Sequence, residues 1–517
     1  MPRIPHGASL RLEALHAVIA AVHEVASNVS LPFNFIAQHL LTDFGYMFDD
    51  LQNQPGSLLP DSTDAEVRRT VDNLKRLGAT MMDTGQAPDS AIPALYTYFG
   101  QFVAHDISFE AESRDLSDPT LKPLTADEVR RGIKNTRTAT LDLDSVYGNE
   151  LFNLIPRKSQ KPDHLKLGPL SPSGFPPADG EIFNDVPREG YNYNDYMHDR
   201  AAIIGDPRND ENVITSQLHV AFLRAHNALV DEEKLTFNQA RIVLRQHFQW
   251  VVLDDYLRRI ADPAVVDEVL ADPRPVYDPS DSDFFLPLEF SMAAYRFGHA
   301  MIRESYHYNH AFNNGLKARL GQLFIPLEDD WRTLPDQWVI GWENFVDDGR
   351  NMARRIDTQL VEPLSKLLGG DRKPLKNEMA RLAVRNLLRG YMLRMPTGQA
   401  VARALGRVPL TEAEIEGAAA HQEQRTVLRD SGFTENTPLW FYILAEAAHT
   451  RARAEEEDRQ VDHLGPVGSR IVAEVLVGLI RRSQDSILRV DGWEPTLPKE
   501  GDRFKLPDIL RLAGVLG

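Results

Sequence analysis

Apolar side chains recur along this chain at the three- and four-residue spacing of amphipathic helices, and long alternating strand patterns are scarce. This spacing predicts helices because side chains at positions i, i+3, i+4 and i+7 share one helix face. The predicted helices span residues 9–29, 64–77, 92–105, 214–231, 236–260, 290–302, 375–388, 411–424 and 468–482. The pattern therefore predicts a mainly α protein with long irregular connections.

Two regions fall outside this helical pattern. Residues 156–195 are rich in Pro, Gly, Asp and Asn, a composition that predicts a long loop. Loops of this length are uncommon inside compact domains and are often functional, so we expect this one to help shape an access channel. We expect residues 1–60 to form an N-terminal extension packed on the main body, and residues 61–517 to form a single large domain.

Composition narrows the classes of function. The net charge of −18 and the pI near 5.4 argue against non-specific binding of nucleic acid or anionic membranes. The absence of cysteine excludes disulfides, thiolate metal sites, iron–sulfur clusters and a cysteine nucleophile. No apolar run reaches the length of about 18–20 residues that a membrane span needs. The stretch 9–29 carries charged residues unlike those of a signal peptide. We therefore expect a cytoplasmic protein, or one exported by a signal-independent route.

The segment 98–106 carries the first candidate site. It reads Tyr-Phe-Gly-Gln-Phe-Val-Ala-His-Asp, and a helix would place Gln101 and His105 on one face. An amide and an imidazole would then point into the same space, while Asp106 would point about 100° away around the helix. A lone histidine in an apolar helix is more often a satisfied core residue. The functional interpretation of Gln101 and His105 therefore depends on matching motifs elsewhere in the chain.

Two later motifs supply such pieces. Residues 205–212 read Gly-Asp-Pro-Arg-Asn-Asp-Glu-Asn, and a turn before a helix could aim Arg208 into a cavity. The alternative is an ordinary helix start with acidic residues that favour the helix dipole. In residues 294–302, Ala-Tyr-Arg-Phe-Gly-His-Ala-Met-Ile, Gly298 would let a flat group approach closely beside His299. A buried imidazole there could be an axial ligand of haem iron or a core histidine.

Oxygen-bearing side chains are concentrated in residues 138–148, which read Thr-Ala-Thr-Leu-Asp-Leu-Asp-Ser-Val-Tyr-Gly. An extended backbone would place Thr138, Thr140, Asp142 and Asp144 on one side. Several oxygen ligands suit a hard cation such as calcium, although the spacing is not that of an EF-hand. A solvated acidic turn explains this segment, taken alone, equally well.

Together these motifs resemble those of the animal-type haem peroxidases, within the peroxidase–cyclooxygenase superfamily. The resemblance covers roughly residues 90–485. In the order of the family, the matching motifs are Gln101-x-x-x-His105-Asp106, Val146-Tyr147-Gly148, Gly205-Asp206-x-Arg208, Arg296-x-Gly298-His299 and Arg385-Asn386-Leu387-Leu388-Arg389-Gly390. Each motif alone is weak, but five in this order are strong. The resemblance implies a single mainly α haem peroxidase domain with long irregular loops.

The resemblance also implies roles for the matching residues. His105 looks like the distal acid–base, Gln101 like its companion, Arg208 like the distal arginine and His299 like the proximal ligand of haem b iron. Asn386 would orient His299 through a hydrogen bond. Two further residues, Glu211 and Arg296, would border the cofactor. The implied calcium ligands are Asp106, Thr138, Thr140 through its carbonyl, Asp142 and Asp144.

The implied activity is that of a peroxidase. His105 would move the peroxide proton and Arg208 would stabilise developing charge, so that a ferryl intermediate oxidises small organic substrates or halides. The expected partners are hydrogen peroxide and a small reducing substrate. Ala104 stands where the family often has an ester-forming aspartate, so we expect at most one ester to haem, through Glu211. Asn212 stands where myeloperoxidase has a sulfonium-linked methionine, so we expect weaker halide oxidation, particularly of chloride.

Two other functions stay open at this point. The oxygenases of the superfamily carry a catalytic tyrosine three residues before the proximal histidine, a position occupied here by Arg296. Tyr295 is one residue off, yet a shift in helix geometry could bring it near the haem. A fatty-acid dioxygenase or cyclooxygenase-like activity is therefore one alternative. The other is a non-catalytic haem-binding or adhesion protein, against which the intact set of His105, Arg208 and His299 speaks.

The remaining histidines and tryptophans are interpreted as structural. We expect His219 and His226 to serve in packing or hydrogen bonding. We expect the aromatic cluster of Trp331, Trp338 and Trp342 to belong to the core rather than to form a radical relay. We expect His307 and His310 to be exposed.

Overall fold

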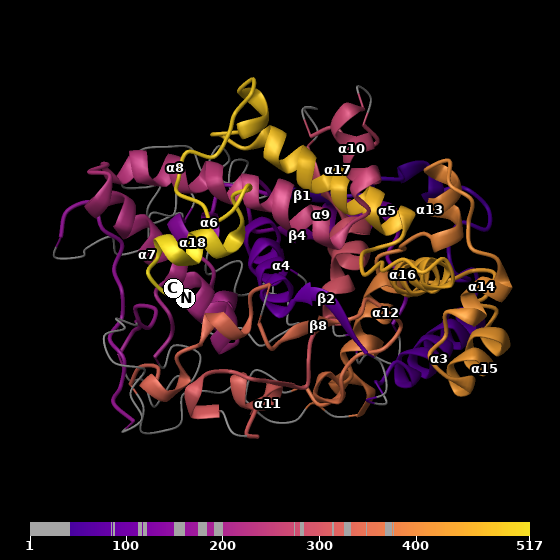
Figure 1. The fold of residues 1–517 in the computed structure, drawn as a ribbon. Coiled ribbons are helices and arrows are strands. Elements are labelled where there is room, and N and C mark those ends of the chain that lie inside the picture. The colour runs from indigo at the N-terminus through magenta and orange to yellow at the C-terminus, as the bar shows by residue number, and fades with distance from the viewer. Residues whose placement is uncertain are drawn as a thin grey trace.

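The computed structural model (Figure 1) describes residues 42–83, 85, 88–111, 116, 121–148, 161–173, 184–190, 200–272, 275–279, 284–312, 315–324, 332–347, 349–367, 375 and 377–517. The predicted helix 9–29, Trp331 and parts of the predicted loop 156–195 lie outside these residues. The parts of that loop that are described contain no helix, only isolated bridges such as that between Gly168 and Asp185.

Helices dominate the described residues, and strands are short and few. The α-helices are α3 (Asp64–Thr80), α4 (Ala94–Ile107), α5 (Ala126–Gly132), α6 (Asp144–Tyr147), α7 (Val213–Glu232), α8 (Phe237–Trp250), α9 (Leu257–Ile260), α10 (Pro263–Ala271), α11 (Leu320–Leu323), α12 (Leu382–Met392), α13 (Gly398–Ala404), α14 (Glu412–Gly417), α15 (Gln422–Ser431), α16 (Leu439–Glu456), α17 (Pro466–Arg482) and α18 (Leu506–Leu512). Two π-helical segments are η3 (Val251–Tyr256) and η4 (Glu289–Ala293). The 3-10 helices are η1 (Asp49–Gln52), η2 (Pro207–Asp210), η5 (Ala294–His299), η6 (His310–Phe312), η7 (Asp336–Trp338), η8 (Trp342–Asn344), η9 (Glu362–Ser365), η10 (Asn377–Ala380) and η11 (Ile487–Arg489). The predicted mainly α class is confirmed.

The strands form one four-stranded sheet and two two-stranded sheets. The strands are β1 (Thr42–Gly45), β2 (Asp89–Pro93), β3 (Glu110–Ala111), β4 (Lys134–Asn135), β5 (Phe285–Pro287), β6 (Ser305–Tyr306), β7 (Ala318–Arg319) and β8 (Met352–Arg354). The larger sheet has the order β3-β4-β1-β5, with β1 parallel to β5 and antiparallel to β4. This sheet joins residues far apart in the chain, because Thr42 pairs with Asn135 and Asp43 with Phe285.

Helix α4 lies in the interior of the molecule (Figure 1), where it contacts α6, α7, η2, η5, β2 and β8. Its apolar residues pack on all sides, and the ring of Phe102 stacks on that of Phe222 in α7 with centroids 4.8 Å apart. Gly100 permits a close approach on another side, since a Cβ there would lie 2.3 Å from the hydroxyl of Tyr256. A helix that is apolar on nearly every face is buried, and its polar residues therefore need partners or a cavity.

Most helix predictions agree with the structure, with three corrections. The predicted helices 64–77, 92–105, 214–231, 236–260 and 468–482 are helical, with a π-helical segment inside the fourth. The predicted helix 290–302 is wrong as a single α-helix, because it is a π-helix followed by a 3-10 helix with a break at Ala293 (φ −130°, ψ −75°). The predicted helix 375–388 is an α-helix only from Leu382. It starts there because the backbone of Arg381 is extended, and the Arg381 guanidinium donates a hydrogen bond to the carbonyl of Ala79 at 3.1 Å. The predicted helix 411–424 is two helices, the second capped by His421.

Residues 42–52 pack on the main body through buried hydrogen bonds. The Glu289 carboxylate accepts from the backbone amides of Met47 and Phe48 at 2.9 and 3.2 Å, and the Tyr46 hydroxyl donates to the carbonyl of Leu393 at 2.9 Å. Residues 1–41 lie outside the described part of the chain, so the predicted domain boundary at residue 60 stays a prediction.

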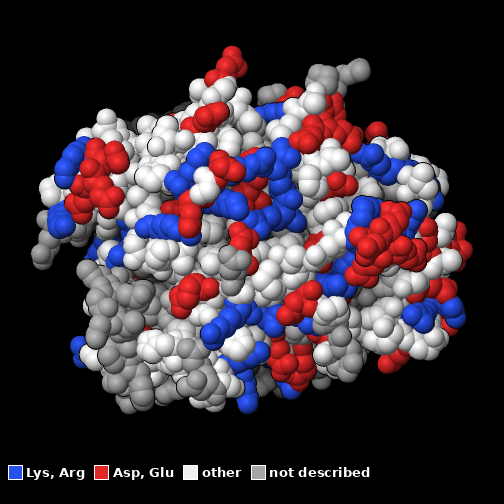
Figure 2. All heavy atoms as spheres, viewed as in Figure 1, with Lys and Arg blue, Asp and Glu red and all other residues white. Residues whose placement is uncertain are grey.

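The face shown in Figure 2 carries acidic and basic groups side by side rather than a field of one sign. No helix among the described residues is both long enough and apolar enough to cross a membrane.

Candidate active site

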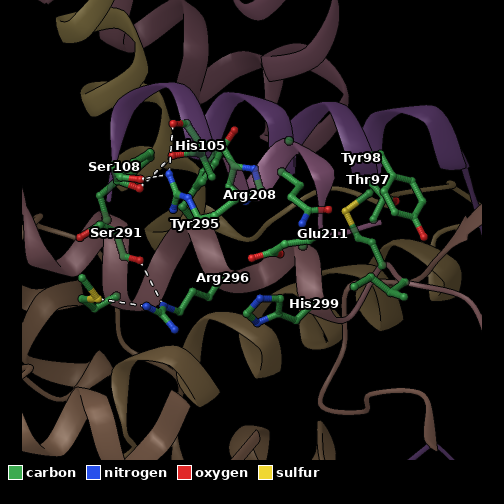
Figure 3. A pocket seen from close by; sticks show the side chains of 18 of the residues that line it. Thr97, Tyr98, His105, Ser108, Arg208, Glu211, Ser291, Tyr295, Arg296 and His299 are labelled. Atoms are coloured by element: carbon green, nitrogen blue, oxygen red, sulfur yellow. Dashed lines mark hydrogen bonds between the residues drawn. The ribbon is translucent and has the colours of Figure 1, made fainter. Parts of the chain in front are cut away.

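One cavity of about 180 Å³ brings together most of the predicted site residues. Its walls come from α4, from η2 and the residue after it, and from the η4–η5 segment. The predicted site residues that line it are Gln101, His105, Arg208, Glu211, Arg296 and His299. Figure 3 shows His105 projecting from α4 on one side, with His299 and Arg296 on the opposite side. Segments separated by nearly two hundred residues therefore meet around one space.

His105 is held through its Nδ1 atom by a side-chain amide. The imidazole is buried, and its Nδ1 lies 2.8 Å from Oδ1 of Asn209, whose Nδ2 lies 3.0 Å from Nδ1 of His219. The amide satisfies both contacts when its oxygen accepts from His105 and its nitrogen donates to His219. Burial lowers the pKa of His219 to about 4, which keeps that ring neutral and able to accept. His105 then carries its proton on Nδ1 and leaves Nε2 as the basic nitrogen.

Gln101 lies one helical turn before His105 on the same face. Its Oε1 accepts from Nδ2 of Asn212 and from the hydroxyl of Thr215, both at 3.1 Å. These two bonds fix the amide so that Nε2 is its remaining donor, and among the described residues this buried Nε2 has no partner. Because Gln101 lines the cavity, it presents an unused N–H donor beside His105.

Arg208 is fixed by a buried carboxylate and an aromatic ring. Its Nε donates to Asp206 at 3.0 Å, and its Nη2 donates to the carbonyls of His105 and Ser108 at 3.1 and 2.6 Å. The guanidinium lies over the Phe109 ring, 4.2 Å from the centroid. Burial alone would raise the pKa of Asp206, but Arg208 and Arg137 outweigh it and hold that pKa well below its usual range. The positive charge of Arg208 is therefore anchored at the edge of the cavity nearest His105.

The η4–η5 segment supplies the opposite wall. Nδ1 of His299 lies 2.9 Å from Nδ2 of Asn386, and Oδ1 of Asn386 accepts from Nη1 of Arg296 at 2.9 Å. Arg296 also donates to the carbonyl of Ser291 at 3.2 Å. An arginine can only donate, so it fixes the orientation of the Asn386 amide. The space beside His299 is open, because a Cβ added to Gly298 would meet no atom within 4 Å. Glu211 reaches into the same space, between Arg208 and His299 in the view of Figure 3.

Tyr295 also lines the cavity, which is the outcome that a shift in helix geometry was expected to allow. Its ring stacks on Phe290 with centroids 4.7 Å apart and meets Tyr256 edge to face at 6.5 Å. The change from π-helix to 3-10 helix at Ala293 alters which residues of this segment share a face, and Tyr295 and Arg296 both reach the cavity. Burial, and then the neighbouring Tyr256, raises the pKa of Tyr295 well above its ordinary value.

The predicted calcium segment is bent rather than extended, which corrects the expected backbone. Ala139 and Leu143 have positive φ values of 48° and 57°. The bends nevertheless bring side chains together: the Thr138 hydroxyl donates to Asp144 and lies 3.2 Å from that of Thr140. The alternation argument was therefore wrong about the backbone, although these side chains do converge.

The negative charge of these carboxylates favours a cation, but the side chains do not form a complete coordination shell. Asp106 accepts from the backbone amides of Leu143 and Ser145 at 3.1 and 2.8 Å. Burial, and then the charge of Asp144, raises the pKa of Asp106 to about 8. Oδ1 of Asp142 is buried with no partner among the described residues. Within those same residues, no group of three or more His, Asp or Glu side chains is placed to hold a metal ion.

Several site residues were missed by the sequence. Asn209 was read only as part of a turn, and His219 was assigned to packing or hydrogen bonding without a link to His105. Arg389 and Glu110 also line the cavity and form a buried ion pair of 3.0 Å. Arg389 belongs to the motif of residues 385–390, so its place in the site could have been predicted from the sequence. Glu110 lies in a two-residue strand, and no motif indicated that it belongs to the site.

The other histidines differ in outcome. His226 is a buried hydrogen-bonding residue as predicted, with Nδ1 3.0 Å from the Tyr147 hydroxyl. His310 is exposed as predicted, whereas His307 is half-buried, which corrects that expectation.

Comparison with known proteins gives the family. The family model of the animal haem peroxidases matches residues 122–390, which is more than half of the chain. The chain belongs to the animal haem peroxidase family. This membership confirms the resemblance found in the sequence.

Two curated relatives match parts of this family member. A peroxidase-like protein of Margaritifera margaritifera is 28% identical over 198 residues, which cover 33% of this chain and 22% of that protein. Peroxidase mlt-7 of Caenorhabditis elegans is 27% identical over 183 residues, covering 33% of this chain and 23% of that protein. The matches thus span less than a quarter of either relative.

Solved structures show the same fold at low sequence identity. Peroxidase A from Dictyostelium discoideum matches with a TM-score of 0.53 and 18% identity, covering 86% of this chain and 88% of that one. The fatty acid alpha-dioxygenase of Oryza sativa matches with a TM-score of 0.51 and 13% identity, covering 86% of this chain and 76% of that one. The fold is therefore common to peroxidases and oxygenases.

Proposed function

We propose that this protein is a haem peroxidase that reduces hydrogen peroxide and oxidises small organic substrates or halides. One observation carries the proposal: two histidines from distant segments line opposite sides of one cavity, and each is fixed through Nδ1 by an asparagine amide. A base with a defined tautomer on one side and an oriented imidazole on the other are the protein groups that a haem peroxidase needs.

The residues around the cavity fit haem b. His299 would hold the iron through Nε2, and the open space at Gly298 suits a flat group. Arg296 and Arg389 are cations at the cavity wall that could receive the two haem carboxylates. Bound haem would supply the electron-transfer chemistry, while the protein supplies binding, orientation and proton handling.

Cofactor binding would rearrange the proximal hydrogen bonds. A neutral imidazole that binds iron through Nε2 carries its proton on Nδ1 and needs an acceptor there. The Asn386 amide would then have to turn its oxygen toward His299, away from Arg296. Arg296 would lose that acceptor and could donate to a haem carboxylate instead. Asn386 and Arg296 would thus change partners together.

On the distal side the chain's own groups would move one proton. Nε2 of His105 would accept the proton of bound peroxide and return it to the departing oxygen. The anchored charge of Arg208 would favour the negative charge that develops as the O–O bond breaks. Gln101 Nε2 would donate a hydrogen bond to the peroxide or to a halide.

Covalent attachment of haem is proposed at one position at most. Glu211 reaches the cavity and could form one ester, whereas Ala104 cannot form the second. The Asn212 side chain caps α7 and donates a hydrogen bond to Gln101. Because asparagine has no sulfur atom, it cannot form a sulfonium link. We therefore propose weak oxidation of halides, chloride above all.

Calcium binding is proposed as a structural feature outside the reaction. The mutual repulsion of three buried carboxylates and the unpartnered oxygen of Asp142 support it. Bound calcium would have to draw Asp106 away from the backbone amides that it now accepts from. Loss of thermal stability on treatment with a chelator would support the proposal, and an unchanged melting temperature would oppose it. We also keep the assignment of residues 61–517 to one peroxidase domain as a proposal.

The experiment that tests the function is the absorption spectrum of haem-loaded protein before and after addition of hydrogen peroxide. A histidine-ligated ferric spectrum that changes on peroxide addition, with the change strongly slowed in His105→Ala, is expected. The exposed His310 provides the matched control, since His310→Ala should react like the wild type. A haem spectrum unmoved by peroxide would contradict the proposal and favour a non-catalytic haem-binding or adhesion role.

An oxygenase is the second candidate, because Tyr295 lines the cavity among aromatic and thioether side chains. The fold shared with a fatty acid alpha-dioxygenase adds to this possibility only at the level of architecture. Oxygen uptake with a polyunsaturated fatty acid, lost in Tyr295→Phe, would favour the oxygenase. Peroxide-dependent oxidation of small phenols that is retained in Tyr295→Phe would favour the peroxidase.

A further inference from the structure

A chain of aromatic rings starts at the cavity, on the face of α4 that also carries Gln101 and His105. Tyr98 lines the cavity and lies at the end away from Ser108 and Ser291 in Figure 3. Its hydroxyl donates to the hydroxyl of Tyr306 at 2.8 Å, and the two ring centroids are 5.8 Å apart. The cavity is thereby connected to a second aromatic side chain more than two hundred residues away in the chain.

The chain of rings continues toward the protein surface. Tyr306 stacks on Phe345 with centroids 5.6 Å apart, and Phe345 meets Tyr308 edge to face at 6.3 Å. Tyr308 contacts Trp338 at 6.2 Å, and Trp338 packs on Phe312 at 4.8 Å. Tyr306, Phe345 and Tyr308 are fully buried, whereas Trp338 and Phe312 are half-buried, which corrects the interpretation of Trp338 as a core residue. The rings therefore connect the cavity with an indole that reaches solvent.

Contact between successive rings matters because electron transfer through protein falls steeply with distance. Each step in this series is within the range of ordinary aromatic contact, about 4.5–7 Å between centroids. An electron could thus cross from Trp338 to the cavity without one long jump. Packing accounts for the buried members, but it gives no reason for the series to reach a half-buried tryptophan.

The chemistry of the phenols indicates which side chain of the series would remain oxidised. Burial raises the pKa of Tyr98 and of Tyr308 well above the ordinary value. Tyr98 donates to another phenol, and Tyr308 donates to the backbone carbonyl of Trp338 at 2.7 Å. Neither acceptor is a base that could take the proton that an oxidised phenol releases. An oxidised indole at the surface can release its proton to water, so Trp338 is the favoured end point.

We propose that Trp338 is a surface oxidation site that takes bulky aromatic electron donors, such as polymeric phenols, which cannot enter the cavity. This inference rests on the proposed peroxidase function. In each step a phenolic donor gives one electron and one proton at Trp338, and the electron passes along the rings to the cavity. Two such steps supply the two electrons and two protons that convert one hydrogen peroxide into two water molecules.

The test compares hydroquinone free in solution with hydroquinone coupled to dextran, two donors of equal chemistry and different size. Haem-loaded wild type, Trp338→Phe and Phe345→Leu are compared with Trp493→Phe, which alters a half-buried tryptophan outside the series. Trp338→Phe keeps the Tyr308 hydrogen bond, which is made to a backbone carbonyl. A second readout needs no donor: a nitroso spin trap is added with one equivalent of peroxide, and the labelled peptide is located by mass spectrometry.

The expected result is a spin-trap adduct on Trp338 that Trp338→Phe abolishes. Oxidation of the dextran-linked donor should fall about tenfold or more in Trp338→Phe and Phe345→Leu, and the free donor should change less than about twofold. Trp493→Phe should match the wild type with both donors. Equal oxidation of the dextran-linked donor by Trp338→Phe and wild type, or an adduct elsewhere, would overturn this inference alone. No reaction of the wild type with peroxide would overturn the proposed function as well.

Discussion

Replacement of Asn209 by alanine tests the idea that a side-chain amide sets the tautomer of His105. The amide oxygen lies 2.8 Å from Nδ1 of His105, and the amide nitrogen lies 3.0 Å from Nδ1 of His219. Alanine removes both contacts. The imidazole of His105 could then place its proton on Nε2 and turn away from the productive orientation.

The size of the effect follows from burial. His105 and Asn209 are both buried, so Asn209→Ala leaves an N–H donor in a site with little water. Leaving a buried donor unpaired costs about 1–3 kcal/mol. If that cost appears fully in the barrier of the proton-transfer step, the rate falls about 5- to 150-fold. Asn209→Asp keeps an acceptor for His105 and should retain more of the rate than Asn209→Ala.

The assay is the second-order rate constant for the reaction of haem-loaded protein with hydrogen peroxide, measured by stopped-flow absorbance. Ser216→Ala is a matched control, because it removes a nearby hydrogen bond to Asp210 of 3.4 Å without touching His105. A rate constant in Asn209→Ala equal to that of the wild type would refute the tautomer argument. Equal losses in Asn209→Ala and Ser216→Ala would point to general damage of the segment instead.

Three further predictions concern stability and covalent structure. Burial lowers the pKa of His219 to about 4, so the unfolded chain binds its proton more readily. Above about pH 6.5 the ring is neutral in both states, so its titration does not change stability. Stability falls by up to about 3 kcal/mol as the pH drops to 4, and it should fall less steeply in His219→Phe. Parallel melting curves of the two proteins across that range would contradict this. Gly100→Ala would place a Cβ 2.3 Å from the Tyr256 hydroxyl, and it should lower the free energy of unfolding by about 1–3 kcal/mol in chemical denaturation; unchanged stability would show that Tyr256 moves without cost. Mass analysis after denaturing extraction should find haem attached to the wild type and released from Glu211→Gln, and complete release from both would exclude the ester.

Helix α4 shows how much of the site can be predicted from the sequence alone. Its length, its apolar periodicity and the four-residue spacing of Gln101 and His105 are local properties of the chain, so both residues could be placed on one face before any tertiary contact was known. The same holds for α7, whose predicted bounds differ from the structure by one residue at each end, and for α17, whose predicted start differs by two residues and whose predicted end agrees. These helices follow from spacing because packing reinforces a preference that is already present locally.

The η4–η5 segment shows where such reasoning fails. An apolar run around His299 predicted one α-helix, but the chain changes from π-helix to 3-10 helix at Ala293. Short helices of these kinds are stabilised by the surrounding structure rather than by local propensity. The change places both Arg296 and Tyr295 at the cavity wall, and a sequence offset of one residue could not reveal this.

The sequence by itself determined the mainly α class, the family, the helix that carries Gln101 and His105, and the motifs that supply Arg208 and His299. Only the tertiary structure decided that Asn209 connects His105 to His219, that Tyr295 enters the cavity and that three rings join Tyr98 to Trp338. The physical reason is that helix periodicity acts between neighbours in the chain. Hydrogen-bond partners of buried polar groups, and contacts between rings, are instead selected by packing among segments that are distant in sequence.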